Sequence, residues 1–354
     1  MKIGIDVQTT QGQKTGFGFY VENLVKELKQ IDRANKYYYF TPKTEEDFSM
    51  PKRFFWDQIF VPLRAYKNRV DIFHQPCFSL PILFRGKIIA TIHDLIAIKF
   101  PHDIPFFSRQ FFSRWMPFSY RKADHIICTS EHTKQDLIAI AKIPSSKISV
   151  IPLAANDYFK PARHKILPPQ KFNIKHPYFL HVGTLNPRKN LIFLVEVFAE
   201  VIKRFPNYQL VLIGKKGWYF ETLFAKITQL GITQKVIFLD YISEEEKLIL
   251  YQNAFGFLFP SIYEGFGLPP LEAMKCGVPV VASNVSSIPE VVGDAGILVS
   301  LTDKKGWVSA VQSLIEKPQY RQNLIMKGFQ QADKFSWRFT AEKTLEIYEK
   351  VYRQ

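Results

Sequence analysis

Two glutamates, Glu264 and Glu272, stand eight positions apart in a segment rich in glycine and proline. We expect a strand to end near Phe259, a loop to carry Glu264, and a helix to open at Pro270 and close at Gly277. A loop acid and an acid in the first turn of a helix can both point into the space above a sheet. A solvated loop acid and a carboxylate placed against the helix dipole are the ordinary structural explanations. The surrounding glycines and prolines favour a binding or catalytic role.

A second segment places Arg188 and Lys189 between an expected strand and an expected helix. Cations at a helix N-terminus oppose the macrodipole by about 0.3 to 1 kcal/mol each. An anion between the cations and the helix end would remove this conflict, and a diphosphate fits that position. Solvated surface charges are the alternative. Gly214 and Lys215, which precede Lys216-Gly217-Trp218, repeat the pattern more weakly.

In the first half of the chain, His93 and Asp94 follow an expected strand over residues 87–92. They fit a reactive pair and a polar strand end equally well. Gly16 and Gly18 precede the first expected helix and permit close approach of the backbone to a ligand. Position 21, where a dinucleotide fingerprint requires its third glycine, is Val21, so the motif does not support NAD binding.

Short β-branched runs alternate with amphipathic segments, which predicts parallel α/β sheets. The expected strands cover residues 2–7, 70–73, 87–92, 125–128, 148–151, 178–182, 209–213, 236–239, 256–259 and 279–282. The expected helices cover residues 20–30, 106–122, 134–141, 191–204, 220–230, 244–253 and 270–275, followed by a terminal helical region.

The length of 354 residues corresponds to about two domains. A proline-rich stretch interrupts the alternation of strands and helices, which is typical of a linker. We therefore predict a doubly wound domain over residues 1–162, a linker over 163–177, a second doubly wound domain over 178–335 and a final segment over 336–354. Ligands of such sheets bind outside the carboxyl ends of the strands.

Lysine and arginine exceed aspartate and glutamate by 47 to 32, a formal net charge of +15. Such a charge favours an anionic partner: nucleic acid, an acidic membrane leaflet or a phosphorylated small molecule. No nucleic-acid-binding signature accompanies the charge, so we expect no nucleic-acid partner.

The three cysteines are scattered, which excludes a disulfide framework or a zinc site as an expectation. No Asp-x-Asp, His-Glu-x-x-His or Walker lysine suggests a bound metal. No apolar run reaches the roughly 18 to 20 residues of a membrane span, and the N-terminal residues lack the apolar region of a signal peptide. We expect a cytoplasmic protein.

These motifs resemble the retaining glycosyltransferases of family 4, which have the GT-B fold. The resemblance runs through both halves of the chain and is strongest over residues 179–299, where the Glu-x7-Glu segment at 264–272 matches without a gap. It implies two Rossmann-like doubly wound domains that face a cleft, with a C-terminal helix that crosses back to the first domain. His93-Asp94-Leu95, together with residues 214–218, is similar to mannosyltransferase members, so GDP-mannose leads over UDP-hexoses as the donor.

The resemblance also implies a role for each site residue. Arg188 and Lys189 would hold the donor diphosphate, Glu264 would contact the transferred sugar, and Glu272 would accept from the ribose hydroxyls. His93 would face the reacting centre, so the catalytic set is Glu264, His93, Lys189 and Arg188. Backbone amides near the sugar and phosphate would come from Phe266, Gly267 and Leu268. The remaining expected donor-site residues are Gly16, Gly18, Gly183, Asn190, Gly214, Lys215 and Gly265.

The implied function is metal-independent, cofactor-free transfer of a hexose to a glycan or a lipid-linked glycan. As a loop acid, Glu264 is expected to contribute to stability only within ~0.5 kcal/mol. One alternative is another enzyme of the same fold, such as a sugar-nucleotide epimerase or a phosphorylase, although we find no pyridoxal lysine site. Another is a non-catalytic protein that binds membrane surfaces or nucleic acid through its basic charge.

Residues 106–122 are dense in aromatic side chains and carry only positive charge. On a helix, Phe107, Phe111, Trp115 and Phe118 share one face. Two interpretations stay open. The segment is either an ordinary helix packed into the first domain and kinked at Pro117, or an interfacial helix that dips into an anionic leaflet at the inner face of the membrane.

Overall fold

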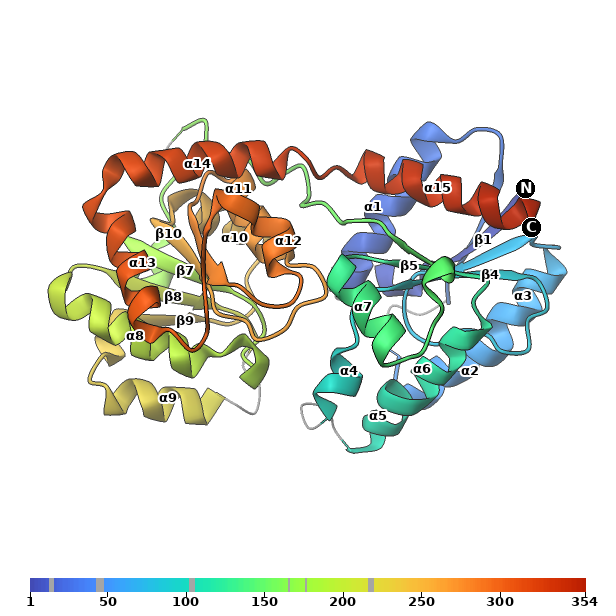
Figure 1. Ribbon diagram of the computed structural model, residues 1–354, viewed down its shortest axis with the longest axis horizontal. Helices are drawn as coiled ribbons and strands as arrows, with labels where there is room; N and C mark the ends of the chain where they lie inside the picture. Colours follow the sequence, from blue (N-terminus) through green and yellow to red (C-terminus); the bar gives the residue numbers. More distant parts are fainter. Residues whose placement is uncertain (13–15, 43–47, 102–105, 165, 176, 216–219) are drawn as a thin grey trace. The chain divides into compact units, whose positions relative to one another are not determined.

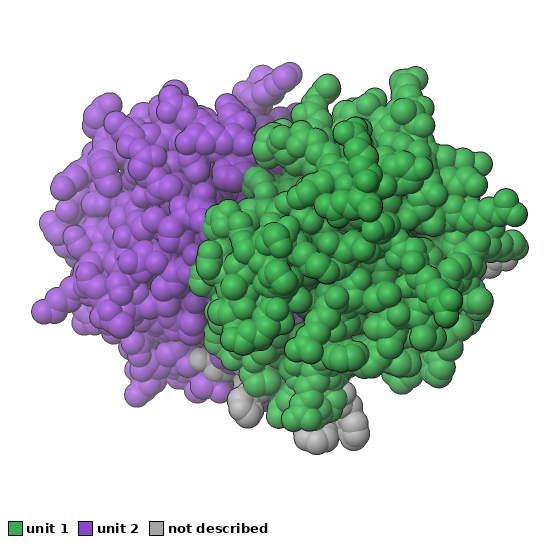
Figure 2. All heavy atoms as spheres, turned by 45° about the vertical axis from the view of Figure 1, so that its right-hand side comes forward, with its two compact units in different colours: residues 1–153, 336–354 green, residues 154–335 purple. Residues whose placement is uncertain are grey.

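The computed structural model describes residues 1–12, 16–42, 48–101, 106–164, 166–175, 177–215 and 220–354 (Figure 1). The chain forms two compact units, shown in different colours in Figure 2: unit 1 is Met1–Leu153 with Ser336–Gln354, and unit 2 is Ala154–Phe335. Each unit contains one sheet of six parallel strands with helices packed on it. The α/β fold with two doubly wound sheets is therefore confirmed. The cleft between the units stays a prediction.

The sheet of unit 1 has the strand order β2-β1-β3-β4-β5-β6. Its strands are β1 (Lys2–Asp6), β2 (Lys36–Phe40), β3 (Ile72–Gln75), β4 (Lys87–Ile92), β5 (His125–Cys128) and β6 (Ile148–Val150). The order reverses direction between β1 and β3, so the carboxyl ends of these two strands flank the position where such sheets bind ligands.

The helices of unit 1 are α1 (Gly16–Ile31), α2 (Met50–Phe55), α3 (Val61–Lys67), α4 (Ile96–Lys99), α5 (Phe106–Gln110), α6 (Met116–Ser119), α7 (Glu131–Ala139) and α15 (Trp337–Arg353). The expectation that Gly16 and Gly18 lie in a loop before the first helix is wrong, because α1 begins at Gly16. Phe17 packs on the His93 ring, with ring centroids 5.0 Å apart, which gives this glycine-rich first turn a tertiary contact.

The segment 106–122 is not one regular helix. A π-helical turn over Phe111–Trp115 separates α5 from α6, and a short 3-10 turn over Tyr120–Lys122 ends the segment. Pro117 lacks the amide hydrogen that a regular helix requires, and the π-helical turn ends just before it. Among the side chains that the structure describes on the predicted apolar face, only Phe118 is exposed. This arrangement favours the interpretation that the segment is packed into the first domain. The side chain of Phe107 lies outside the described ones.

The C-terminal helix α15 belongs to unit 1 and packs against α1 (Figure 1). Ser336 caps it by accepting from the amide of Phe339 at 3.1 Å. In the interior, the Tyr348 hydroxyl lies 2.6 Å from Nδ1 of His74, whose Nε2 lies 2.8 Å from the Thr91 hydroxyl. Burial lowers the pKa of His74 to about 3, so the ring is neutral. A chain of buried hydrogen bonds therefore fixes α15 to β3 and β4.

The sheet of unit 2 has the order β12-β11-β10-β7-β8-β9. Its strands are β7 (Tyr178–Val182), β8 (Gln209–Ile213), β9 (Val236–Leu239), β10 (Gly256–Phe259), β11 (Val280–Ser283) and β12 (Ile297–Val299). Its helices are α8 (Leu191–Arg204), α9 (Phe220–Gln229), α10 (Glu244–Asn253), α11 (Leu268–Lys275), α12 (Ile288–Val292), α13 (Lys304–Glu316) and α14 (Pro318–Ala332). The strand order reverses between β7 and β10.

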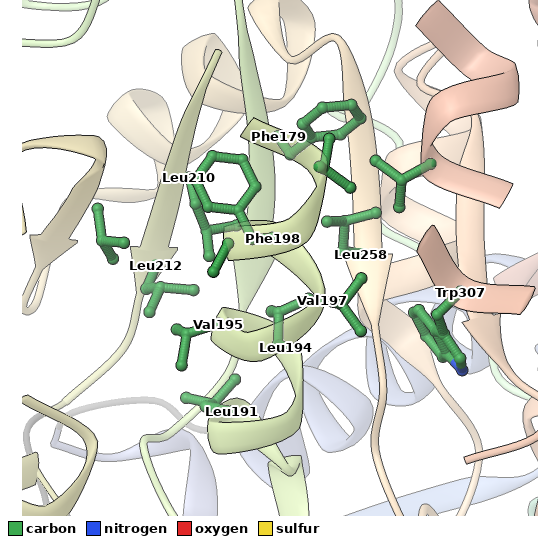
Figure 3. Packing of buried hydrophobic residues seen from close by; sticks show 14 of the residues in the cluster. Phe179, Leu191, Leu194, Val195, Val197, Phe198, Leu210, Leu212, Leu258 and Trp307 are labelled. Carbon is green, nitrogen blue, oxygen red and sulfur yellow. The ribbon is translucent and has the colours of Figure 1, made fainter. Parts of the chain in front are cut away.

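The core of unit 2 lies under α8. Figure 3 shows Leu194 and Phe198 of this helix among the apolar side chains of the sheet, with Trp307 of α13 beside them. Leu194, Phe198 and Trp307 are completely buried. The alternating burial of α8 follows from apolar residues at helical spacing, which is why the sequence predicted its bounds.

The units divide after Leu153, whereas we expected the first domain to reach residue 162 and a linker to follow. Phe159 is buried and packs edge-on against Tyr251, with ring centroids 5.6 Å apart. Lys275 binds the same segment through an ion pair with Asp157 at 2.9 Å. These contacts place residues 154–162 with unit 2, because packing rather than the position of the prolines decides where the segment belongs.

Replacing Tyr348 by phenylalanine removes one buried hydrogen bond and leaves Nδ1 of His74 unpaired. We expect the Tyr348→Phe variant to lose about 1 to 3 kcal/mol of unfolding free energy. Tyr352→Phe is the matched control, because Tyr352 lies on the same helix and is exposed. Urea denaturation followed by circular dichroism measures both. Equal midpoints for the two variants would show that the His74–Tyr348 contact does not stabilise unit 1.

Candidate functional site

The loop between β7 and α8 contains two cationic residues, Arg188 and Lys189. After β7 the chain passes Gly183 and forms a short 3-10 turn over Pro187–Lys189, in which the Asn186 side chain accepts from the amide of Lys189 at 3.3 Å. Asn190 has a φ of +55° and reverses the chain into α8. The turn therefore holds Arg188 and Lys189 directly before the N-terminus of α8, as the sequence predicted.

Glu264 lies between these two cations. Arg188 Nη1 is 3.0 Å from one carboxylate oxygen, Lys189 Nζ pairs with the other, and the Ser261 hydroxyl donates to that second oxygen at 2.5 Å. We call Arg188, Lys189 and Glu264 the ion cluster. Burial raises the pKa of Glu264, but the charges of Lys189 and Arg188 outweigh burial and hold the pKa below its ordinary value. The carboxylate is therefore ionised at neutral pH.

Two serines that follow β11 fix the Glu264 loop. The Ser286 hydroxyl accepts from the amide of Glu264 at 3.1 Å. The Ser287 hydroxyl lies 2.9 Å from the carbonyl oxygen of Glu264 and 2.7 Å from that of Phe266, so its one proton is shared between them. The sequence analysis did not identify these serines as site residues. Their position directly after a strand of the same sheet was the available signal, because parallel strands end at one edge.

The expectation of a solvated Glu264 with little effect on stability does not fit the structure. Only 9% of the residue is exposed, and both carboxylate oxygens are paired. The loop residues of Phe259–Phe266 are mostly buried because the serines bind the backbone there. Glu264 is thus part of the folded interior as well as of the candidate site.

The glycines of the neighbouring loops permit close packing of the strand ends. A Cβ atom on Gly214 would lie 2.0 Å from the carbonyl oxygen of Gly183, so only glycine fits there. The amide of Leu185 donates to the carbonyl of Lys215 at 3.3 Å, which joins the two loops. Residues 216–218, which continue the expected motif, lie outside the described residues.

Glu272 lies in the second turn of its helix, because α11 begins at Leu268 and not at Pro270 as expected. Gly267, with a φ of +118°, opens the helix, and Gly277 closes it as predicted. The first amides of a helix have no partner within the helix, and those of α11 begin at Leu268, next to the Gly265–Gly267 loop. Phe266 is buried and packs against Phe335, with ring centroids 5.7 Å apart.

The carboxylate of Glu272 makes its described polar contacts with α10. The Tyr251 hydroxyl donates to it at 2.9 Å, and Lys247 Nζ lies 3.9 Å away. Burial raises the pKa of Glu272 above its ordinary value. Within the described contacts, Glu272 therefore belongs to a neighbouring cluster and is not paired with the ion cluster.

His181 of β7 is a further residue that the sequence analysis missed. Its Nδ1 donates to the carbonyl of Leu258 at 2.9 Å, and its buried Nε2 has no hydrogen-bond partner among the described residues. Burial, together with the positive charge of Lys189, lowers its pKa to about 4, so the ring stays neutral. A Cβ on Gly183 would lie 3.4 Å from this Nε2 and 3.1 Å from Cε of Lys189.

In unit 1, His93 lines a pocket of about 260 Å³. The other lining side chains are mostly apolar: Phe17, Cys77, Phe78, Thr91, Ile92, Asp94, Ile96, Ala97, Phe112, Met116 and Tyr120. Nε2 of His93 donates to the carbonyl of Pro76 at 3.0 Å, so the neutral ring keeps Nδ1 free of a proton. Burial lowers the pKa of His93 to about 4. The structure places His93 in a pocket with an unprotonated Nδ1, which can accept a hydrogen bond.

A cluster of buried polar side chains lies between β1 and β3, where the strand order of the sheet reverses. Asp6 accepts from Trp56 Nε1 at 3.2 Å and from Gln75 Nε2 at 3.1 Å, and Arg53 packs over the Phe78 ring at 4.0 Å. Burial raises the pKa of Asp6 above its ordinary value. No local motif marks these residues, since they come from three separate segments.

Family models match both halves of the chain. "Glycosyltransferase Family 4" covers residues 16–157, and "Glycosyl transferases group 1" covers residues 163–331. O-antigen chain mannosyltransferase B of Escherichia coli is 32% identical over 302 residues, which span 84% of this chain and 77% of that protein. The chain belongs to glycosyltransferase family 4. The resemblance stated from the motifs is thereby confirmed.

Other relatives carry similar names. This glycosyltransferase is 26% identical to the MMP alpha-(1->4)-mannosyltransferase of Mycolicibacterium hassiacum over 308 residues, 82% of this chain and 72% of that one. Sucrose-phosphate synthase from Thermosynechococcus elongatus superposes with a TM-score of 0.79 at 20% identity, covering 100% and 99% of the two chains. Anabaena Alr3699/HepE in complex with UDP and glucose gives 0.74 at 18% identity, covering 99% of each chain. These structures confirm the GT-B fold.

The ion cluster makes stability depend on pH. In the unfolded chain Glu264 titrates near its ordinary pKa of 4.5, and in the folded protein it titrates lower. The stabilisation by the carboxylate is therefore present above about pH 4.5 and is lost as the pH falls through the folded-state pKa. Glu264→Gln leaves two cations without their counter-ion, so we expect it to lose about 3 kcal/mol of unfolding free energy at pH 7.

Urea denaturation of wild type and Glu264→Gln across pH 7 to 3.5 measures this difference. The difference in unfolding free energy should begin to narrow below about pH 4.5, where the carboxylate gains its proton in the unfolded wild-type chain, and should shrink further as the pH falls through the lower folded-state pKa. Glu200→Gln is the control, because Glu200 is an exposed partner of Lys203 on α8. A Glu264→Gln variant as stable as the control at pH 7 would contradict the stabilising role of the ion cluster.

Proposed function

We propose that this glycosyltransferase transfers mannose from GDP-mannose to a glycan or lipid-linked glycan, with retention of the anomeric configuration. The ion cluster is the observation that supports a donor site in unit 2. It lies where the strand order of the sheet reverses, between β7 and β10. Two cations and one carboxylate leave a net charge of +1 directly before the N-terminus of α8. Such a position attracts a phosphate or diphosphate.

Glycosyl transfer builds negative charge on the departing diphosphate as the bond from the sugar to oxygen lengthens. Arg188 and Lys189 would stabilise that charge, since both are held in place before the donor arrives and need little rearrangement. Glu264 currently accepts from both cations. A bound diphosphate would take over part of this pairing, and the freed carboxylate oxygens could then accept from sugar hydroxyls.

Retention of the anomeric configuration is proposed because the motifs resemble those of retaining glycosyltransferases. In that mechanism the acceptor attacks from the face that the leaving group occupies, and a leaving-group oxygen takes the acceptor proton. The low pKa of Glu264 keeps a negative charge beside the positively charged sugar of the transition state. That is a stabilising role and not proton transfer, because an ionised carboxylate has no proton to donate.

The nucleoside would lie on the Glu272 side of the site. Glu272 is partly exposed, and its carboxylate keeps acceptor capacity beyond the bond from Tyr251, which suits the ribose hydroxyls. Mannose is supported by the names of the relatives, of which several are mannosyltransferases. Guanine is the base that the motif resemblance favours.

The acceptor would bind in the unit 1 pocket. Its aromatic walls fit the apolar face of a sugar ring, and Nδ1 of His93 can accept from an acceptor hydroxyl. The relatives named for the O-antigen chain support a growing polysaccharide as the acceptor. A lipid-linked acceptor would bring the enzyme to the cytoplasmic face of the membrane, although no described helix is long and apolar enough to cross one.

Arg188→Ala and Lys189→Ala test the diphosphate site. Each removes one charge-assisted contact worth about 1.5 to 3 kcal/mol, so kcat/KM should fall roughly 10- to 150-fold. Lys203→Ala is the control, because Lys203 is an exposed cation of α8. Steady-state kinetics that stay unchanged in both site variants would remove the assignment.

A panel of nucleotide sugars tests the proposed reaction. With a mannose-terminated oligosaccharide as acceptor, GDP release should be fastest from GDP-mannose, and activity should persist in EDTA because the cations of the protein take the place of a metal. Conversion of the nucleotide sugar without release of nucleoside diphosphate would indicate an epimerase. Loss of activity in EDTA with recovery in Mn²⁺ would contradict metal independence.

A further inference from the structure

Unit 1 carries an exposed apolar surface that glycosyl transfer does not use. Eight large apolar side chains lie on it, each exposed by more than a third: Phe54, Phe55, Ile59, Phe60, Leu63, Tyr66, Leu83 and Phe118. Six of them come from the α2–α3 segment, a continuous helix with a π-helical turn over Trp56–Phe60. We call these eight residues the apolar stripe. Figure 1 shows α2 and α3 on the same side of the unit as α6.

The stripe is one surface built from separate segments. Phe55, Ile59, Leu63 and Tyr66 recur at intervals of four, four and three residues, which places them on one face of a helix. Phe54 contacts Trp115 with ring centroids 5.3 Å apart, and Trp115 contacts Phe118 at 5.9 Å. The Tyr66 hydroxyl donates to the carbonyl of Leu83 at 3.1 Å.

The stripe is the outer face of this helix. The opposite face is in the core, where Trp56, Val61 and Ala65 are buried and belong to the unit 1 cluster. Leu63 and Leu83, by contrast, are 62% and 71% exposed. A helix anchored by one apolar face has no structural need for a second one, and exposed apolar patches of this kind mark interaction sites.

The charges around the stripe are positive. From Phe48 to Val70 the only acid is Asp57, and it is completely buried. Exposed cations stand within four positions of stripe residues in the sequence: Lys67, Arg69, Arg85, Arg114, Arg121 and Lys122. The acids Glu45, Glu46 and Asp47 precede the segment in the sequence and lie outside the described residues.

From this surface we infer that the enzyme binds anionic bilayers through the apolar stripe. The aromatic and aliphatic side chains would enter the boundary between headgroups and acyl chains, and these exposed cations would pair with anionic lipid headgroups. The contact helix is α2–α3 and not residues 106–122, whose described aromatic side chains are mostly packed inward apart from Phe118. The inference goes beyond the proposed reaction, since it concerns where the enzyme works and not which donor it uses.

Vesicle flotation of the full chain tests the inference. We expect binding to vesicles of equal parts phosphatidylcholine and phosphatidylglycerol, weak binding to pure phosphatidylcholine, and weaker binding at high salt. The double variant Phe55→Ser/Leu63→Ser should bind the anionic vesicles at least roughly tenfold more weakly. The matched control is Tyr320→Ser/Met326→Ser, which removes two exposed apolar side chains from α14 and should bind as the wild type does.

Three further measurements make the outcome decisive. Thermal unfolding must show that Phe55→Ser/Leu63→Ser stays folded, and light scattering without lipid measures the oligomeric state of both proteins. Undiminished vesicle binding by the folded stripe variant would overturn the inference. A wild-type dimer that the same variant dissociates would also overturn it, because the stripe would then bind a second copy of the chain. GDP release from the variant, measured with a water-soluble acceptor, separates this result from a failure of the proposed reaction.

Discussion

The pairing of one buried carboxylate with two cations holds the candidate donor site together. Glu264, Arg188 and Lys189 are largely withdrawn from water, where an unpaired charge would be strongly unfavourable. Removing Glu264 would leave two cations in the interior without their counter-ion. The conformation of the loops that follow β7 and β10 is therefore tied to the electrostatics that would bind the diphosphate.

The topology of the sheet brings these loops together. β7 and β10 are hydrogen-bonded neighbours although Glu264 follows Lys189 by 75 positions in the sequence, and β8 and β11 flank these two strands. All four strands are parallel, so their carboxyl ends meet at one edge and deliver Gly214, the ion cluster and Ser286 to the same place. Unit 1 repeats the arrangement, with its buried Asp6 group at the reversal between β1 and β3 and its pocket beside β4.

Much of this could be predicted from local sequence patterns. β7, α8, β8 and β10 have the predicted bounds because each is a periodic apolar run ended by glycine, proline or a polar residue. Prediction failed where a remote contact decides the local structure. The first turn of α1 forms on contact with His93, and segment 154–162 joins unit 2 through Tyr251 and Lys275.

The burial of Glu264 could not be predicted from the residues around it in the sequence either. A glycine-rich loop suggests an exposed acid, and only the fold shows that serines from after β11 enclose it. The missed residues, His181 among them, share this property, since their partners are distant in sequence. The α2–α3 helix was not predicted at all, because apolar residues cover both its faces and the usual amphipathic period is absent.

The central claim is that the ion cluster recognises the diphosphate of the donor. Isothermal titration of wild type and Lys189→Ala with GDP, and with guanosine as the ligand that lacks phosphates, tests it directly. We predict that GDP binds Lys189→Ala at least roughly tenfold more weakly than wild type, because one charge-assisted contact is lost, while guanosine binds both equally. Equal affinity of the two proteins for GDP would contradict the account.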